Sequence, residues 1–272
     1  MTPDLPIYFI NLAHRPERRA FMERQFERLG LEATRVEAAP VGDSAIDPRA
    51  NANLGPAEAA CATSHVLAWQ TLLAASGSPE WGLVLEDDGI LSDSLPGFLD
   101  EFLSGASEIP VDAVQLEVRR RPVRVLPHTV TLPSGRRLAP FRSTREGGAC
   151  YLISRRAIEI LMARSDLFHQ PIDLTIFRPF QGPGSAIRTL LADPGLCIQL
   201  DETGSAASSS RSDVASSRTA PTRLEWTRRR RFYLASLNFL DHVTHVPRGL
   251  RRRVIQFDGD IVSGTEPPDG SR

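Results

Sequence analysis

The stretch WGLVLEDD, at residues 81–88, is an apolar run of strand length that ends in three consecutive acids. A short apolar run of this kind is typical of a buried strand in an α/β protein. Alternate residues of an extended segment share a face, so Glu86 and Asp88 are expected to point one way and Asp87 the other. In open α/β sheets, ligands bind outside the carboxyl ends of the strands, where this run places its acids.

Two carboxylates on one face suit a hard divalent cation. Mg²⁺ and Mn²⁺ prefer oxygen ligands, and Mg²⁺ usually lies between one or two protein carboxylates and a substrate phosphate. Glu86 and Asp88 are therefore candidate metal ligands. A second interpretation fits the same residues, because three acids after a strand also form a solvated turn that caps a following helix, expected from Asp93 to Leu103. The run alone favours neither interpretation.

The composition limits the class of protein. The 272 residues are enough for one large α/β domain with an appendage, and a net charge of −1 gives no argument for a nucleic-acid partner. All 32 basic residues are arginine. P-loop enzymes need a lysine at the terminal phosphates, and aspartate-based phosphotransferases also need one, so the sequence disfavours both classes.

The cysteines and the apolar stretches predict a cytoplasmic protein. Cys61, Cys150 and Cys197 are far apart in apolar contexts, which is typical of core thiols in a reducing compartment. The chain shows neither a basic leader with a following apolar segment nor an apolar stretch of about 18 residues that would span a membrane.

Polar residues follow the first predicted strand, from Ile7 to Leu12. Asn11 lies near its end, and Arg15 and Arg18 come before or within a helix that Pro16 opens. This loop places arginines at the carboxyl end of a strand, within reach of a nucleotide, although a solvated helix start would look the same.

A long helix is expected from Ala57 to Ala75. Cys61, Ser64 and His65 share one of its faces, and a single histidine on such a face is more often a core residue than a ligand. Further strands are expected at 113–118, 147–153 and 196–200, with an antiparallel flap or a loop at 119–145 and a helix beginning at Ser154. Gly147 and Gly148 permit either a bulge or a close backbone approach to a ligand.

The C-terminal region divides by composition. Residues 203–222 are predicted to form a Ser-rich linker, 223–257 a basic amphipathic helical extension, and 258–272 a disordered tail. Arginine clusters at Arg228–Arg231 and Arg251–Arg253 make the extension a candidate for binding an anionic membrane surface. A helix packed on the domain with solvated arginines is the alternative.

Several separated segments together resemble glycosyltransferase family 25, the bacterial lipooligosaccharide sugar transferases related to collagen galactosyltransferases. The matching segments are Ile10–Leu12 with Arg15-Pro16 and Arg18-Arg19, Glu58–Cys61 with Ser64-His65 and Trp69, Leu85–Asp88, Val114–Glu117, Gly147–Ile153 and Pro171–Asp173. Their order and spacing make the combination specific over residues 5 to 200.

This resemblance implies a GT-A-like fold: one α/β nucleotide-sugar-binding domain over residues 1–202, with a mixed central sheet. It implies inverting transfer from a UDP-sugar, with galactose the first expectation, and Mn²⁺ or Mg²⁺ held by Glu86 and Asp88. The base that takes the acceptor proton is expected to be Asp173, or second Glu117. The expected donor-binding residues are Asn11, Arg15, Arg18, Ser64, His65, Glu86, Gly147 and Gly148.

The sequence departs from the family pattern at two places. Residues 57–61 read AEAAC where Gly-Glu-Ile-Gly-Cys is frequent, and Gln115 replaces a common lysine. The leading hypothesis is a metal-dependent glycosyltransferase that acts on a lipooligosaccharide, lipopolysaccharide or exopolysaccharide precursor at the cytoplasmic face of the membrane. The alternatives are a catalytically degenerate family member that serves as a binding or assembly subunit, and a metal-dependent phosphohydrolase, which the absence of lysine disfavours.

Overall fold

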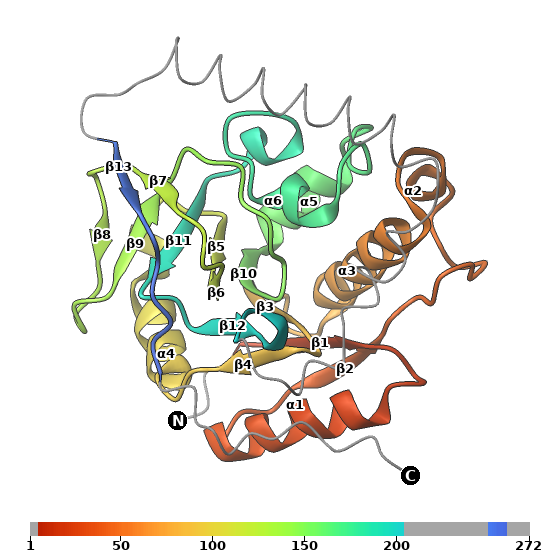
Figure 1. The fold of residues 1–272 in the computed structure, drawn as a ribbon, viewed down its shortest axis with the longest axis horizontal. Coiled ribbons are helices and arrows are strands. Elements are labelled where there is room, and N and C mark those ends of the chain that lie inside the picture. Colours follow the sequence, from red (N-terminus) through yellow and green to blue (C-terminus); the bar gives the residue numbers. More distant parts are fainter. Residues whose placement is uncertain (1–4, 204–249, 260–272) are drawn as a thin grey trace.

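An eight-stranded mixed sheet forms the centre of the fold in the computed structural model, which describes residues 5–203 and 250–259 (Figure 1). The strand order is β2-β1-β3-β10-β5-β11-β9-β8. The strands are β1 (Ile7–Asn11), β2 (Thr34–Glu37), β3 (Trp81–Glu86), β5 (Ala113–Gln115), β8 (Val130–Thr131), β9 (Arg137–Pro140), β10 (Cys150–Ser154) and β11 (Thr189–Asp193). β1 is parallel to β2 and β3, whereas β10 runs antiparallel between β3 and β5. The predicted α/β fold with a mixed sheet is confirmed.

Helices cover both faces of this sheet. Side chains alternate along each strand, so Tyr8 and Val84 join a core with α3 (Pro56–Ala74), α5 (Arg155–Met162) and α6 (Ile172–Ile176). Their neighbours Phe9 and Leu83 join a second core with α1 (Pro16–Leu29) and α4 (Leu95–Gly105). The remaining helices are α2 (Pro48–Asn53) and the short 3-10 turns η1 (Ala106–Glu108), η2 (Pro183–Ala186) and η3 (Leu200–Glu202).

A smaller sheet lies at the carboxyl ends of the central strands. Its order is β4 (Gly89–Leu91), β12 (Cys197–Gln199) and β6 (Glu117–Val118). The chain passes from β3 into β4 through Asp87 and Asp88, and from β5 into β6 through Leu116. The three acids therefore lie at the junction of the two sheets, and β12 ends opposite Gly89, beside them.

Most of the predicted elements are confirmed, with shifts at their ends. The strand expected at 113–118 is broken at Leu116, because its two halves pair in different sheets. The sequence did not predict α2, β4 or β11. The flap is antiparallel as expected, with β8 and β9 joined by a turn in which Gly135 has a φ of 86°. In the described part of the chain, no helix combines the length and hydrophobicity needed to cross a membrane.

The helix predicted for 223–257 is wrong at its end. Arg251–Arg253 form strand β13, which pairs antiparallel with β7 (Val123–Val125) of the flap (Figure 1). The segment is held by the burial of Ile255 and by an ion pair of 3.2 Å between Arg253 and Asp193. A short basic and apolar run fits a strand as well as a helix, and pairing with β7 decides the outcome. The Arg228–Arg231 cluster, the linker after Thr203 and the tail after Gly259 lie outside the described residues.

Candidate active site

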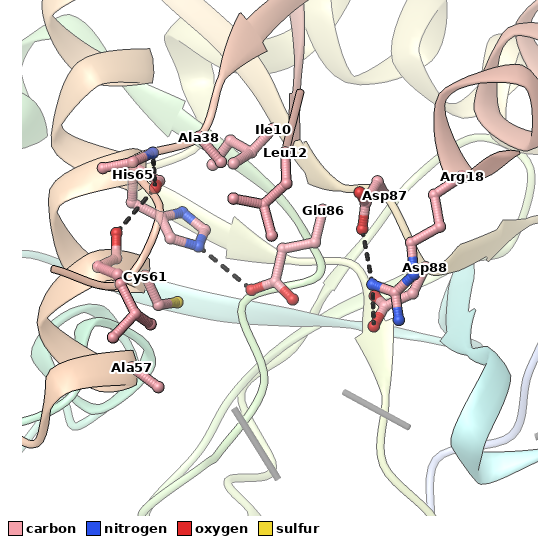
Figure 2. Close-up of a pocket in the computed structure, with 14 residues that line it drawn as sticks. Ile10, Leu12, Arg18, Ala38, Ala57, Cys61, His65, Glu86, Asp87 and Asp88 are labelled. Carbon is pink, nitrogen blue, oxygen red and sulfur yellow. Dashed lines mark hydrogen bonds and ion pairs between the residues drawn. The ribbon is translucent and has the colours of Figure 1, made fainter. Parts of the chain in front are cut away.

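A pocket opens where β1 and β3 end beside α3 (Figure 2). Its polar lining comes from Arg18, Ser64 and His65 and from Glu86–Asp88, which we call the acidic turn. Its apolar lining includes Ile10, Leu12, Ala38, Ala39, Val41, Ala57 and Ala60, and Cys61 adds a thiol. The carboxyl end of the central sheet therefore carries a pocket with acids at one side, as the sequence predicted.

Asp87 ties three elements together. Its carboxylate accepts a hydrogen bond from Asn11 Nδ2 at 2.7 Å and one from Arg18 Nη1 at 2.9 Å (Figure 2). Burial raises the pKa of Asp87, whereas Arg18 and Asn11 act to lower it. Asn11 also accepts a hydrogen bond from Arg35. Asn11, expected to bind the donor, thus holds the acidic turn against β1 and is not among the residues that line the pocket.

Glu86 and Asp88 face a shared partner. Gln199 Nε2 lies 3.4 Å from Glu86 Oε2 and 3.5 Å from Asp88 Oδ1. The amide orientation is fixed because Gln199 Oε1 accepts a hydrogen bond from Arg119. An amide hydrogen donor therefore lies between the two carboxylates. Gln199 was not predicted as a site residue, because nothing in the sequence around it shows that its strand ends beside the acids.

Among the described residues, the two acids have only a partial counter-charge. The pKa of Asp88 is raised to about 7, first by burial and then by the charge of Glu86, while Arg18 at 3.8 Å lowers it in part. Neighbouring carboxylates with an oxygen-only donor set fit a hard divalent cation such as Mn²⁺ or Mg²⁺. The residues present therefore fit the metal that the sequence predicted.

The helix α3 holds Glu86 from the other side. His65 Nε2 lies 3.2 Å from Glu86 Oε1, and His65 Nδ1 lies 2.9 Å from the Tyr151 hydroxyl. Ser64 contributes differently, because its hydroxyl donates to the Ala60 carbonyl and accepts from the Ala39 N–H. It therefore secures the segment after β2 against α3. Both Ser64 and His65 line the pocket.

Cys61 differs from the other two cysteines. Cys150 and Cys197 are fully buried, which agrees with the prediction of core thiols. Cys61 is half-buried and lines the pocket. Its pKa is raised well above the usual value by burial, then by the negative charges of Glu86 and Asp173.

The two glycines before β10, Gly147 and Gly148, allow the carboxylates of Glu117 and Glu86 to approach the backbone closely. Gly147 has a φ of 110°, and a Cβ there would lie 2.6 Å from Glu117 Oε2. A Cβ on Gly148 would lie 3.4 Å from Glu86 Oε1. Any side chain at Gly147 would therefore displace Glu117, so the glycine is required by both space and conformation.

The two predicted bases differ in access. The Glu117 side chain is 0% exposed, its Oε2 accepts the Ala149 N–H at 2.7 Å, and burial raises its pKa to about 8. Asp173 begins the first turn of α6 and is half-buried, and its oxygens accept the N–H groups of Gly147 and Leu174. Burial raises the pKa of Asp173. Glu117 is thus an interior support, and Asp173 is the one with an accessible surface.

Arg145, a buried arginine that was not predicted as a site residue, supports the segment around Gly147. Arg145 Nε donates to Gln115 Oε1 at 2.6 Å, and Gln115 Nε2 donates to the Gly147 carbonyl at 2.8 Å. Burial lowers the pKa of Arg145 to about 10. The positive charge beside Gln115 therefore comes from Arg145, and Arg119 instead approaches Glu117 at 3.4 Å.

Arg15 pairs with Glu17 at 3.7 Å and is not among the pocket-lining residues.

A family model supplies the decisive comparison. The model of glycosyltransferase family 25 (LPS biosynthesis protein) matches residues 4–176, which is more than half of the chain. The chain belongs to glycosyltransferase family 25. It is therefore a glycosyltransferase of the lipopolysaccharide and lipooligosaccharide biosynthesis family, and the acidic turn and both glycines lie inside the matched span.

Curated relatives agree with this assignment. The chain is 29% identical over 209 residues to the lacto-N-neotetraose biosynthesis glycosyltransferase LgtB of Neisseria meningitidis serogroup B, covering 71% of this chain and 74% of the relative. The LgtB protein of Neisseria gonorrhoeae is also 29% identical, with 71% and 73% covered.

A solved glycosyltransferase involved in the glycosylation of the major capsid of PBCV-1 covers 75% of this family 25 chain and 95% of its own, at a TM-score of 0.41 and 12% identity. The inositol-1-phosphate CTP transferase from T. maritima covers 71% and 69%, at a TM-score of 0.36 and 12% identity. The family assignment rests on the sequence match and not on these similarities.

Proposed function

We propose that this family 25 enzyme transfers a hexose, with galactose expected first, from a UDP-sugar to a lipooligosaccharide, lipopolysaccharide or exopolysaccharide precursor, with inversion. The observation that carries the proposal is the pair Glu86 and Asp88, which share one amide donor beside a pocket at the carboxyl end of the central sheet. Such an edge is where GT-A-like and other open α/β folds bind nucleotides.

Glu86 and Asp88 would hold Mn²⁺ or Mg²⁺. Bound there, the cation would neutralise the diphosphate that leaves the sugar, as a Lewis acid and template. Arg18 and Asn11 keep the acidic turn in place through Asp87. Gly148 allows the backbone to approach Glu86, which leaves room for the donor at this edge.

Asp173 is the base in this proposal. In an inverting displacement the bond from the sugar C1 to the diphosphate oxygen breaks as the acceptor oxygen bonds to C1 from the opposite face. The acceptor hydroxyl loses its proton to a carboxylate within hydrogen-bond reach. We assign this to Asp173 because it is half-buried beside Gly147, whereas the side chain of Glu117 is fully buried.

The acceptor is the less constrained half of the proposal. The relatives from Neisseria are named for lacto-N-neotetraose biosynthesis, which supports a glycan acceptor. A lipid-linked acceptor would bring the enzyme to the cytoplasmic face of the membrane. Arg251 and Arg252 are exposed on β13 and supply positive charge that suits anionic lipid headgroups.

A thermal-shift panel of UDP-sugars with and without Mn²⁺ tests the proposal, since a ligand that binds only the native state raises the melting temperature. A metal-dependent shift with one donor is expected, followed by a mass increase of one hexose on a lipooligosaccharide acceptor. A panel without any shift would contradict the proposal. Release of inorganic phosphate with no sugar transferred would identify a phosphohydrolase instead.

A further inference from the structure

A chain of hydrogen bonds lies behind Glu86, on the side away from Gln199. Trp69 Nε1 lies 2.9 Å from the Tyr151 hydroxyl, which lies 2.9 Å from His65 Nδ1. His65 Nε2 then lies 3.2 Å from Glu86 Oε1 (Figure 2). The chain starts in the core between α3 and β10 and ends in the pocket.

The direction of the first two hydrogen bonds follows from donor bookkeeping. An indole N–H can only donate, so the Tyr151 oxygen accepts from Trp69 and still has one hydrogen to place. Tyr151 is 0% exposed, and its hydroxyl has these two partners among the described residues. The hydrogen must go to His65 Nδ1, because it would otherwise be buried without an acceptor.

This direction sets the tautomer of His65. A neutral imidazole that accepts at Nδ1 carries its proton on Nε2. That N–H points at Glu86 Oε1 and donates to it. The other tautomer would place a nitrogen lone pair against a carboxylate oxygen and leave the Tyr151 hydrogen without an acceptor. An imidazolium would also strand the Tyr151 hydrogen, so both ends of the chain lead to the same assignment.

We propose that Trp69 and Tyr151 are positioning residues that fix the Nε2–H tautomer of His65, which in turn holds Glu86 with its second oxygen toward Asp88. Glu86 Oε2 is the oxygen that shares Gln199 Nε2 with Asp88, so the hydrogen bond from His65 to Oε1 leaves Oε2 as the oxygen that would be available to a cation. The positioning role rests on the proposed function, because it matters only if Glu86 holds the metal.

The Nε2–H tautomer of His65 also bears on whether the neighbouring Cys61 thiol can take part in a metal site. The ligand atoms of Cys61, His65 and Glu86 lie within 4.8 Å of one another, a grouping that could hold a thiophilic metal such as Zn²⁺. A metal needs the lone pair of the histidine nitrogen, and Nε2 has its proton instead. Metal binding at Nε2 would move that proton to Nδ1 and strand the Tyr151 hydrogen, so the grouping is better suited to a hydrogen-bonded support for Glu86 than to a second metal centre.

Nitrogen NMR tests the tautomer without any substrate. In protein labelled with ¹⁵N-histidine, His65 is assigned by its loss in His65→Gln, and we expect Nε2 to be protonated and Nδ1 unprotonated. A proton on Nδ1, alone or together with Nε2, would overturn the proposal. So would a thiolate-to-metal absorption band on adding Co²⁺ that disappears in Cys61→Ser.

Mn²⁺ affinity tests the positioning role. Titration of Mn²⁺ in the presence of UDP, followed by the EPR signal of free Mn²⁺, should show weaker binding in Tyr151→Phe, by up to about 10-fold, the low end of the loss found when a direct partner of a metal ligand is removed. Tyr8 is another buried tyrosine and lies on β1. The variant Tyr8→Phe is the matched control and should bind Mn²⁺ as the wild type does. Trp69→Phe is the second variant if Tyr151→Phe melts early. Unchanged Mn²⁺ affinity in a folded Tyr151→Phe or Trp69→Phe variant would overturn the positioning role.

If the wild type binds no Mn²⁺ with UDP, the proposed function fails, and the nitrogen spectra still decide the tautomer of His65.

Discussion

Two groups of acids near the ends of the central strands have different surroundings. Asp193 pairs with Arg137 at 2.7 Å and Arg253 at 3.2 Å, and Asp112 accepts from Arg156 and from the Arg188 N–H. Glu86 and Asp88 instead share an amide, while Arg18 remains 3.8 Å from Asp88. We call the first group the paired acids.

The difference shows what each group contributes. An acid with arginine partners fastens one element to another, as Asp193 fastens β13 to β9 and β11. Burial and the charge of Glu86 raise the pKa of Asp88, which disfavours its charged form in the folded protein, so a bound cation would stabilise this group. In the proposed function, the metal-binding acids are thus the group whose negative charge is less compensated.

The largest expected effect is on catalysis by Asp88→Asn. The substitution keeps the shape and removes the charge, so kcat/KM should fall about 10²- to 10³-fold, as when one charge-stabilising group is lost. The melting temperature should stay the same or rise, because a buried negative charge is removed. Steady-state kinetics and a thermal melt check both. Asp193→Asn is the matched control among the paired acids, and equal activity loss in that variant would break the comparison.

Asp87→Ala should affect stability most. It leaves the Arg18 guanidinium buried without its main partner, which costs about 3 kcal/mol in similar cases. Urea denaturation measures the loss. An exposed acid, Asp93, whose side chain is 81% exposed, serves as control and should cost less than about 0.5 kcal/mol when changed to alanine. A loss below about 1 kcal/mol for Asp87→Ala would show that Asp87 does not fasten the turn.

Glu117 adds a third case to the comparison. Arg119 lies 3.4 Å from the Glu117 carboxylate, and burial still raises the pKa of Glu117 from 4.5 to about 8. Between about pH 4.5 and about pH 8, the folded protein therefore binds one proton more at Glu117 than the unfolded chain does. The free energy of unfolding therefore falls as the pH rises, by up to about 1.4 kcal/mol per pH unit. Glu117→Gln removes this slope and should gain stability relative to the wild type from pH 5.5 to pH 8. Urea titrations at both pH values check it, with the exposed Glu23→Gln as control, and parallel curves would contradict the pKa.

The smallest effect is expected for Asp193→Asn. Its two arginines are partly exposed, with side-chain exposures of 38% and 40%, so the ion pairs are screened by solvent. The free energy of unfolding should fall by about 0.5 to 1 kcal/mol with no change in kcat. A change in kcat would mean that β13 contributes to the reaction.

The sequence predicted the parts of this architecture that depend on local patterns. Apolar runs gave β1, β3 and β10, and the acids at the end of β3 gave the position of the pocket. The break at Leu116 was not predictable, because β5 and β6 form one continuous strand-like stretch, AVQLEV, whose two halves pair with strands from distant parts of the chain. Gln199 and Arg145 were missed for the same reason. Nothing local shows that an amide on β12 reaches the acidic turn, or that an arginine in the flap is buried beside Gln115.

The central claim is that Glu86 and Asp88 hold a divalent cation that binds the donor diphosphate. Calorimetric titration of UDP into the wild type and into Asp88→Asn, each with and without Mn²⁺, tests it most directly. We expect the wild type to bind UDP only with Mn²⁺, and Asp88→Asn to show no gain from Mn²⁺. Equal binding of UDP by both proteins, with or without Mn²⁺, would contradict the claim.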